Sequence, residues 1–362
     1  MEIKAAVVHA PHAPFVIKPV RLEAPRADEV LVKLTATGIC HTDVAIVEQI
    51  LPLPLPYVLG HEGAGVVVEA GKSVTSVAKG DHVVLTFGSC GTCLNCTLGH
   101  PAYCSSQPLL NFAGRRSDGS ATVHNTRGEP LNASFFGQSS FATHAISPVR
   151  NAIKVRSDAP LKFLGPLGCG LMTGAGSVLN VLKPTPDSTF VIFGTGALGF
   201  AALFAAKLMG CKRIVAVDRV RSRLDLARTL GAAEVIDTSA TDLDKALAEI
   251  GGADFALDTT GIPKVLEAAV RSLKTCGQLA LVGASPERFM STDIMHMISG
   301  RVIRGVVEGD ANPPVFIPFL VDKFLEGGFP IDKVAALYPF EQINAAVSEA
   351  LSGKTIKPIV VY

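Results

Sequence analysis

The stretch TFVIFGTGALG, from Thr189 to Gly199, decides the fold of this chain. Four consecutive apolar residues, Phe190 to Phe193, are typical of a strand that is buried on both faces. Glycines follow at positions 194, 196 and 199, a spacing that lets a strand turn sharply into a helix. The first glycine permits the tight turn, the second lets a ligand approach the backbone, and the third lets the helix pack on the strand. The stretch therefore predicts the opening unit of a parallel α/β sheet.

Strands and helices continue to alternate after this unit. Strands are predicted at residues 213–217, 234–236, 255–257, 278–282 and 302–306, and the first helix is predicted at residues 201–209. Together with the strand at 190–193 they form a doubly wound parallel sheet joined by right-handed crossovers. This fold binds a dinucleotide at its glycine turn, so residues 171–309 are predicted to be a Rossmann domain that binds NAD.

An acidic residue supports the choice of NAD. Asp218 ends the second predicted strand, at the spacing from the glycine turn that is typical of dinucleotide-binding domains. A carboxylate there accepts hydrogen bonds from the adenosine ribose hydroxyls and would repel a 2′-phosphate. The nearby cations Arg219 and Arg223 weaken this preference for NAD over NADP. The cofactor contacts predicted in this domain include Gly194, Gly196, Ala197, Leu198, Gly199, Asp218, Arg223, Val282 and Gly283.

Four of the eight cysteines, Cys90, Cys93, Cys96 and Cys104, lie close together in the sequence. Four thiolates fill every position of a tetrahedral zinc ion, so the lobe at residues 88–106 is predicted to hold a structural zinc. Bacterial ferredoxins share the C-x-x-C-x-x-C spacing, but their fourth cysteine follows after three residues and precedes a proline. Here seven residues intervene and a serine follows, which favours zinc over an iron–sulfur cluster.

A second set of metal ligands is spread along the chain. Cys40 and His61 lie in the motifs GICHTD and GHEGAG, and Cys169 lies between two glycines. Two thiolates and one imidazole leave the fourth tetrahedral position of a zinc ion free, as a catalytic site requires. A free cysteine is more often a small buried apolar residue, and that is the interpretation for Cys211 and Cys276.

Polar neighbours of these ligands complete the chemistry of an alcohol-oxidising site. A zinc ion lowers the pKa of a bound alcohol, and Thr42 is predicted to relay the proton. Asp43 is predicted to hold the imidazole of His61, and Glu62 to tune the metal. Cys169 comes shortly before the first strand of the dinucleotide domain, where the chain passes between domains. That position predicts a metal beside the nicotinamide, as hydride transfer requires.

Composition limits the classes of partner. The chain has 362 residues, 48% of them apolar, which favours two domains with a large core. Lys and Arg (33) balance Asp and Glu (32), so nucleic acid is not an expected partner. The uncharged residues 190–206 contain three glycines and are short for a bilayer span, so no membrane association is predicted. Because no signal peptide is evident, the cysteines favour a reducing cytoplasm.

The remainder of the chain is predicted from local patterns. Residues 1–90 contain many short, β-branched strands separated by glycine turns. Residues 105–150 are polar and glycine-rich and are predicted to form a loop that closes the first domain. After residue 310 we expect a helix and a closing strand that return to the first domain.

From end to end the chain resembles the zinc-containing medium-chain alcohol dehydrogenases. The matching motifs are GICHTD, GHEGAG, the four-cysteine lobe, GCG at residues 168–170 and the glycine turn at 194. The resemblance implies a GroES-like, β-rich catalytic domain built from residues 1–170 and 310–362, with the Rossmann domain inserted. It implies two zinc ions per chain and a homodimer or homotetramer that pairs through the Rossmann domain. It also implies cofactor contacts from His41, Thr173 and Lys357, the last of these near the phosphates.

Within that family the chain most resembles the aryl-alcohol (benzyl alcohol) dehydrogenases. The stretches GPLGCG, FFGQSSFAT and GVVEG, at residues 165–170, 135–143 and 305–309, carry this match. It implies oxidation of a primary aromatic or allylic alcohol to the aldehyde, with NAD as hydride acceptor. Phe112, Phe135, Phe136 and the leucine–proline stretch at residues 51–56 are compatible with such a substrate. Terpenoid and long aliphatic alcohols are alternative substrates.

One position departs from the family pattern. Many relatives carry a histidine five residues after the first zinc cysteine, as the outer end of the proton relay, and this chain has Ala45 there. Either the relay ends in water or His41 replaces the missing histidine. Two non-catalytic alternatives are an NAD-binding protein and a zinc-thiolate redox sensor, but the presence of both complete ligand sets favours an enzyme.

Overall fold

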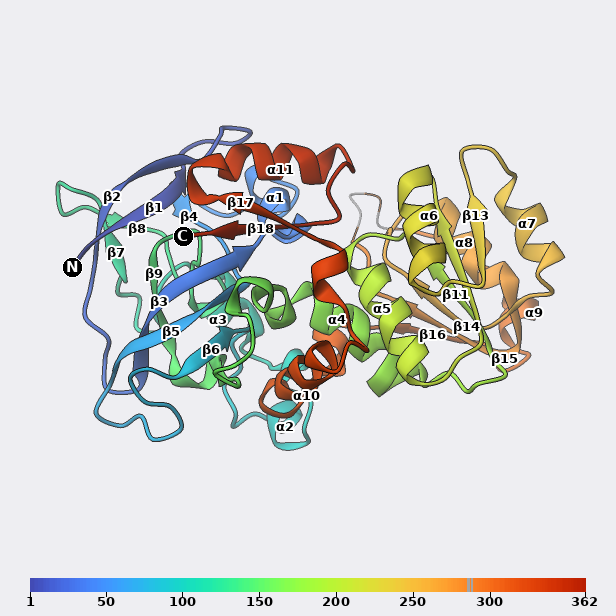
Figure 1. Cartoon of the computed structure of the whole chain (residues 1–362), viewed down its shortest axis with the longest axis horizontal. Coiled ribbons are helices and arrows are strands. Elements are labelled where there is room, and N and C mark those ends of the chain that lie inside the picture. Colours follow the sequence, from blue (N-terminus) through green and yellow to red (C-terminus); the bar gives the residue numbers. More distant parts are fainter. Residues whose placement is uncertain (285–286, 288) are drawn as a thin grey trace. The chain divides into compact units, whose positions relative to one another are not determined.

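The computed structural model describes residues 1–284, 287 and 289–362. These residues form two compact units, and Figure 1 labels their elements. Unit 1 comprises Met1–Cys169, Asn312–Leu325 and Ile331–Tyr362, and unit 2 comprises Gly170–Ala311 and Glu326–Pro330. The main divisions lie close to the expected boundaries at 170 and 310, whereas the short return of the chain to unit 2 at 326–330 was not expected.

Unit 2 contains the parallel sheet that the glycine stretch predicts. Its strands are β11 (Thr189–Phe193), β12 (Arg213–Asp218), β13 (Glu234–Asp237), β14 (Ala253–Asp258), β15 (Leu273–Leu281) and β16 (Val302–Gly305). All neighbours pair in parallel, in the order β13-β12-β11-β14-β15-β16. This order reverses direction at β11, so the ligand crevice of the fold lies at the carboxyl end of β11. The predicted doubly wound sheet is confirmed.

Helices precede the first of these strands and connect the others. They are α4 (Gly170–Gly176), the π-helical η6 (Ser177–Leu182), α5 (Ala197–Leu208), α6 (Arg221–Leu230), α7 (Leu243–Glu249), α8 (Pro263–Ser272) and α9 (Ile294–Met297). Helix α5 begins four residues earlier than predicted, because Gly196 is its N-cap and the glycine turn itself forms the first helical turn. A Cβ at Gly199 would collide with the carbonyl oxygen of Gly194, which explains the third glycine.

Unit 1 is built mainly from two sheets, one antiparallel and the other mixed (Figure 1). Its strands are β1 (Glu2–Val8), β2 (Val16–Leu22), β3 (Glu29–Gly38), β4 (Tyr57–Val58), β5 (Gly63–Ala70), β6 (His82–Leu85), β7 (Val123–His124), β8 (Pro130–Leu131), β9 (His144–Pro148), β10 (Ala152–Lys154), β17 (Ala335–Pro339) and β18 (Lys357–Val361). One sheet has the order β4-β1-β2-β7-β8; the other has the order β10-β6-β5-β3-β18-β17, with β9 also on β3. Because β18 pairs with β3, the C-terminal strand does return to the sheet formed by the N-terminal part of the chain.

The helices of unit 1 include several that the sequence patterns did not predict. They are α1 (His41–Val47), α2 (Leu94–Thr97), α3 (Gln107–Phe112), α10 (Pro313–Leu325) and α11 (Ile343–Leu351). The prediction of a loop over residues 105–150 was wrong, since this segment contains α3, β7, β8 and β9. These elements are short and depend on tertiary contacts: the buried Asn111 side chain accepts from Gly88 N at 2.7 Å and donates to Gly88 O at 3.0 Å.

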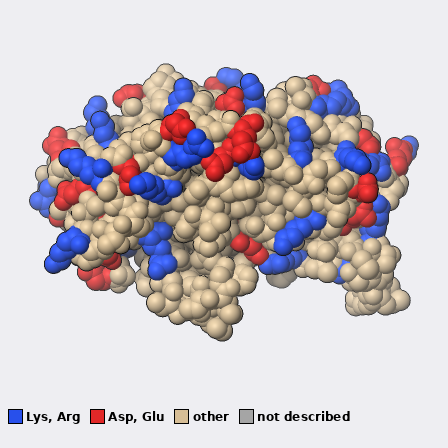
Figure 2. All heavy atoms as spheres, turned by 60° about the horizontal axis from the view of Figure 1, so that its bottom comes forward, with Lys and Arg blue, Asp and Glu red and all other residues tan. Residues whose placement is uncertain are grey.

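Charges of both signs are interspersed on the face shown in Figure 2, as expected from the balanced composition. Among the residues that the structure describes, no helix is both long and apolar enough to span a membrane.

Candidate active site

Unit 1 brings together side chains from three distant segments of the chain. The ligand atoms of Cys40, His61, Glu62 and Cys169 all lie within 4.8 Å of one another. Cys40 is the N-cap residue of α1, His61 and Glu62 lie between β4 and β5, and Cys169 is the last residue before unit 2 begins. The three predicted catalytic ligands therefore lie close together, and Glu62 lies in the same cluster.

The donor set fits a zinc ion. His61 is fully buried, its Nδ1 lies 3.1 Å from Asp43 Oδ1, and its Nε2 has no hydrogen-bond partner among the described residues. A buried imidazole nitrogen normally has a partner. A metal ion could bind this nitrogen and the two neighbouring thiols at the same time. Hydrogen bonding with Cys169 lowers the pKa of the Cys40 thiol well below its usual value, although burial opposes this change. The thiolate is the form that binds metal.

Asp43 links the two chain segments that carry Cys40 and His61. Its carboxylate accepts from Cys40 N at 3.1 Å and from Gly60 N at 2.9 Å, in addition to its contact with His61. Gly60 has φ of +88°, and a Cβ there would collide with Phe141. Only glycine can bring the backbone this close, so the glycine before His61 is needed for the turn that presents the imidazole.

Glu62 forms an ion pair with Lys357. Lys357 Nζ lies 2.5 Å from the Glu62 carboxylate and donates to Ile39 O at 2.9 Å, and both side chains are buried. Burial lowers the pKa of Lys357, but the nearby Glu62 and Cys40 raise it above its usual value overall. Its ammonium group lies inside unit 1, next to the ligand cluster. The expected contact of Lys357 with the cofactor phosphates stays a prediction.

Aromatic rings enclose His61. Phe136 stacks on the imidazole with centroids 4.5 Å apart, and Phe135 meets it edge-on at 5.2 Å. Phe112 contacts both phenylalanines. Gln138, which was not predicted as a site residue, accepts from Gly63 N at 3.0 Å and donates to His61 O at 2.9 Å. Its motif, FFGQSSFAT, was noted only for its family resemblance.

The residues predicted for proton transfer lie on the first turn of α1. Thr42 Oγ1 is 3.6 Å from Cys40 Sγ, and Thr42 is half-buried. His41 is exposed, and Ala45 is half-buried on the same helix. The hydroxyl of Thr42 is thus beside the ligand cluster, whereas His41 faces solvent.

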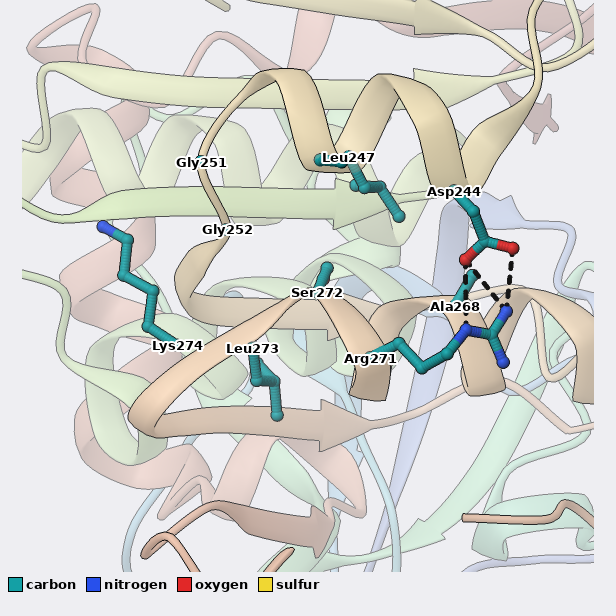
Figure 3. Close-up of a pocket in the computed structure, with 10 residues that line it drawn as sticks. Asp244, Leu247, Gly251, Gly252, Ala268, Arg271, Ser272, Leu273 and Lys274 are labelled. Carbon is teal, nitrogen blue, oxygen red and sulfur yellow. Dashed lines mark hydrogen bonds and ion pairs between the residues drawn. The ribbon is translucent and has the colours of Figure 1, made fainter. Parts of the chain in front are cut away.

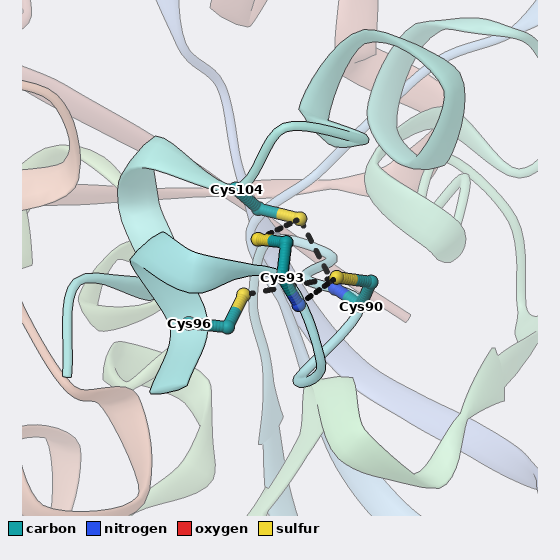
Figure 4. Close-up of side chains that lie close together, drawn as sticks. All are labelled: Cys90, Cys93, Cys96 and Cys104. Atoms are coloured by element: carbon teal, nitrogen blue, oxygen red, sulfur yellow. Dashed lines mark hydrogen bonds between the residues drawn. The ribbon is translucent and has the colours of Figure 1, made fainter. Parts of the chain in front are cut away.

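The four-cysteine lobe forms a second donor cluster, shown in Figure 4. Sulfur atoms of Cys90 and Cys96, and of Cys93 and Cys104, lie 3.9 Å apart. Amide groups donate to these sulfurs: Cys90 N to Cys104 Sγ at 3.2 Å, and Cys93 N to Cys90 Sγ at 3.3 Å. Hydrogen bonds from the amides of Cys96 and Ser105 lower the pKa of Cys93 to about 5, whereas burial raises the pKa of Cys96 to about 12. The four clustered sulfurs fit a closed zinc site.

In unit 2 the predicted cofactor residues gather at the carboxyl edge of the sheet. Asp218 ends β12, and its carboxylate accepts from Thr195 N and Oγ1, both at 2.7 Å. It also accepts from Arg219 N and Val220 N, at 2.7 and 2.9 Å. The chain's own donors thus already fix this carboxylate beside the glycine turn.

Other predicted cofactor residues surround the same edge. Val282 and Gly283 follow β15, and both amides donate to Asp258 O, at 3.0 and 3.2 Å. Thr173 lies buried on α4. Arg223 lies on α6, half-buried, and its Nε has no hydrogen-bond partner among the described residues.

A pocket of about 470 Å³ lies elsewhere in unit 2, between α7 and α8 (Figure 3). It opens at the amino ends of β14 and β15, and its charged residues are paired, Arg271 with Asp244 at 2.9 Å and Lys274 with Asp254 at 2.8 Å. None of the predicted site residues lines it. Because ligands of doubly wound sheets bind at the carboxyl edge, this pocket is not the cofactor site.

Fold and donor sets together define a zinc-binding dehydrogenase made of a GroES-like unit and a Rossmann unit. Residues 26–157 match the alcohol dehydrogenase GroES-like domain, and residues 197–322 match the zinc-binding dehydrogenase domain. A geraniol dehydrogenase from Castellaniella defragrans is 41% identical over 99% of this chain and 97% of its own length. The chain therefore belongs to the zinc-containing medium-chain alcohol dehydrogenase family.

Two solved structures are also similar over the whole chain. The benzyl alcohol dehydrogenase of Acinetobacter calcoaceticus is 45% identical, with a TM-score of 0.96, and the comparison covers 100% of this chain and 99% of that one. An alcohol dehydrogenase zinc-binding domain protein from Burkholderia ambifaria is 48% identical, with a TM-score of 0.98 and the same coverage.

Proposed function

We propose that this protein oxidises a primary aromatic or allylic alcohol to the aldehyde, reversibly, with hydride transfer to NAD. The observation that carries the proposal is the buried cluster of Cys40, His61 and Cys169, in which His61 Nε2 has no partner among the described residues. Three ligands of this kind leave one position of a zinc ion for the substrate.

Two relatives support the substrate class. Benzyl alcohol and geraniol are the substrates in the names of two relatives, at 45% and 41% identity. Both molecules carry a primary hydroxyl on a carbon next to an sp² carbon, so a benzylic or allylic alcohol satisfies both. The phenylalanine rings around His61 make its surroundings apolar, which is compatible with such a planar group. Terpenoid and aliphatic alcohols are the alternative substrates within the same chemistry.

The residues in and beside the buried cluster each have a role in this proposal. When bound at Cys40, His61 and Cys169, zinc supplies a Lewis acid for the alcohol oxygen. Thr42 accepts the hydroxyl proton. Asp43 keeps the Nδ1–H tautomer of His61, so that Nε2 points its lone pair at the metal. Lys357 holds Glu62 by an ion pair, which keeps the carboxylate from filling the fourth position.

Unit 2 takes the cofactor in this proposal. The glycine turn binds the pyrophosphate at the N-terminus of α5, and Asp218 sits where the adenosine ribose is bound in this fold. A carboxylate at that position disfavours a 2′-phosphate, which supports NAD over NADP.

We also propose that unit 2 mediates homo-oligomer formation. β16 is an edge strand of the sheet, and large apolar side chains are exposed in residues 289–307, the segment that contains β16: Phe289, Ile294, Met295, Ile298, Val302 and Val307. Exposed apolar side chains along a free strand edge favour pairing with a second copy. Light scattering that returned a monomeric mass at micromolar concentration would contradict this part of the proposal.

A substrate panel tests the function. Purified protein is assayed with benzyl alcohol, geraniol, a long aliphatic alcohol and a secondary alcohol, each with NAD and NADP, by absorbance of the reduced cofactor. We expect the first two substrates with NAD to give the highest kcat/KM. Turnover of neither would contradict the proposed substrate class, and turnover with NADP alone would contradict the role of Asp218.

A further inference from the structure

The short turn after the last strand of the parallel sheet has an unusual backbone. In η7 (Glu308–Asp310), φ is positive at every residue: 49° for Glu308, 67° for Gly309 and 50° for Asp310. Only the middle residue is a glycine, so two acidic residues adopt a left-handed conformation that side chains rarely take. Strained residues of this kind persist where the surroundings fix them, and they cluster at ligand sites.

The turn lies in the half of unit 2 that the fold assigns to the second nucleotide. It follows the carboxyl end of β16, and the ligand edge of a doubly wound sheet is the carboxyl edge. Asp218, beside the adenosine position, ends β12, on the other side of β11 from β14, β15 and β16. The two halves of this sheet each bind one mononucleotide, so η7 belongs to the nicotinamide half.

Helix α4 joins this turn to the glycine turn. A Cβ at Gly176 would collide with the backbone of Gly309, and Asn180 Nδ2 donates to Gly309 O at 2.9 Å. On the same helix, a Cβ at Gly174 would collide with Leu198 O, in the turn that receives the pyrophosphate. α4 is thus in backbone contact with both turns, and Thr173 lies beside Gly174 on this helix.

The Glu308 carboxylate contacts that threonine. Glu308 is only 9% exposed, and Thr173 Oγ1 donates to its Oε2 at 3.3 Å. Two other contacts hold the shape of the turn, the ion pair of Asp310 with Arg304 and the hydrogen bond of Asn180 to Gly309. These two contacts support the backbone of the turn at Gly309 and Asp310, and the buried Glu308 carboxylate faces Thr173.

We propose that Glu308 is a positioning residue of the nicotinamide site. Its carboxylate orients the Thr173 hydroxyl and places a negative charge beside the ring. The oxidised nicotinamide carries a positive charge and the reduced one is neutral, so this acid favours NAD⁺ over NADH. The inference rests on the proposed function, because it requires NAD at the glycine turn.

Equilibrium binding of the two cofactor forms tests the proposal. Dissociation constants for NAD⁺ and NADH are measured by calorimetry on the full chain and on Glu308→Gln and Glu308→Gly. Gln keeps the size and the acceptor oxygen, and Gly removes the side chain but suits the left-handed backbone. We expect both variants to raise the Kd for NAD⁺ about tenfold while the Kd for NADH stays within about threefold.

Asp310→Asn is the matched control, since it neutralises another acid of the same turn. It should lower the melting temperature without changing the ratio of the two dissociation constants. A ratio that is unchanged in the Glu308 variants, or changed equally by Asp310→Asn, would overturn the inference. If Glu308→Gln does not fold, Glu308→Gly decides. A wild-type chain that binds neither cofactor form would instead overturn the proposed function, and this inference with it.

Discussion

The four-cysteine lobe draws its ligands from one short segment, whereas Cys40, His61 and Cys169 come from three segments of unit 1 that are far apart in the chain. The lobe has little apolar support: the four residues of α2 are exposed or half-buried. The ligand cluster around His61 is buried and is braced by Asp43, Gln138 and the stacked ring of Phe136.

This difference indicates that the two clusters depend on zinc in different ways. In the lobe, few contacts other than those of the thiolates stabilise the local fold, so zinc takes the place of a hydrophobic core. Around His61 the protein itself fixes the donors, so zinc is needed for chemistry more than for folding. The expectations below test this contrast, in order of decreasing effect.

The largest effect is expected at the buried cluster. Cys169→Ser should lower kcat/KM at least about a thousandfold, because the metal that polarises the alcohol is lost or misplaced. Metal analysis should show a fall from about two zinc ions per chain to about one. Cys211→Ser, the same change at a buried cysteine outside both clusters, is the control. Retained activity in Cys169→Ser would exclude Cys169 as a catalytic ligand.

In the lobe the effect should appear as lost stability. Cys93→Ser should also remove about one zinc ion per chain, but it should lower the melting temperature by on the order of 10 °C. Activity per folded molecule, assayed at low temperature, should change by no more than about threefold. Should Cys93→Ser abolish activity in protein that remains folded, the two clusters would not be separable in the way described.

Thr42 tests the chemistry of the buried cluster while its metal stays in place. Thr42→Val should lower kcat about a hundredfold, since the proton of the alcohol loses its acceptor. Zinc content and melting temperature should stay as in the wild type. Thr42→Ser restores the hydroxyl and should recover most of the rate. Equal rates for the Val and Ser variants would mean that the hydroxyl has no part in proton transfer.

The smallest effect is expected from the ring that stacks on His61. Phe136→Leu should lower kcat/KM for benzyl alcohol about fivefold, because a stacked ring contributes about 1 kcal/mol to the placement of the imidazole. Zinc should be retained. Phe319→Leu, on α10, is the matched control and should have no effect on kcat/KM. An unchanged kcat/KM in Phe136→Leu would show that Asp43 alone suffices to place His61.

Much of this architecture follows from local sequence patterns. The glycine stretch and the strand periodicity predicted the doubly wound sheet, because every residue involved lies within one short unit of chain. The four-cysteine lobe was predicted equally well, since the spacing of the cysteines identifies the ligand set directly.

Contacts between residues that are far apart in the chain could not be predicted from local sequence patterns. The ion pair of Lys357 with Glu62 was not predicted, because only the pairing of β18 with β3 shows how a residue near the C-terminus reaches Glu62. α3 was missed because its buried Asn111 is held by Gly88, which is distant in the sequence. The acid of η7 was noted only within a matching motif, since neither its backbone strain nor its contact with Thr173 can be read from residue order.

X-ray diffraction at the zinc absorption edge tests the central claim most directly, which is that zinc occupies both clusters and keeps one position open at His61. The account predicts two anomalous peaks per chain. One should be surrounded by four cysteine sulfurs, and the other by Cys40, His61 and Cys169, with solvent or substrate as the fourth ligand. A single peak in the lobe, or a second zinc whose fourth ligand is the Glu62 carboxylate in the presence of substrate, would contradict it.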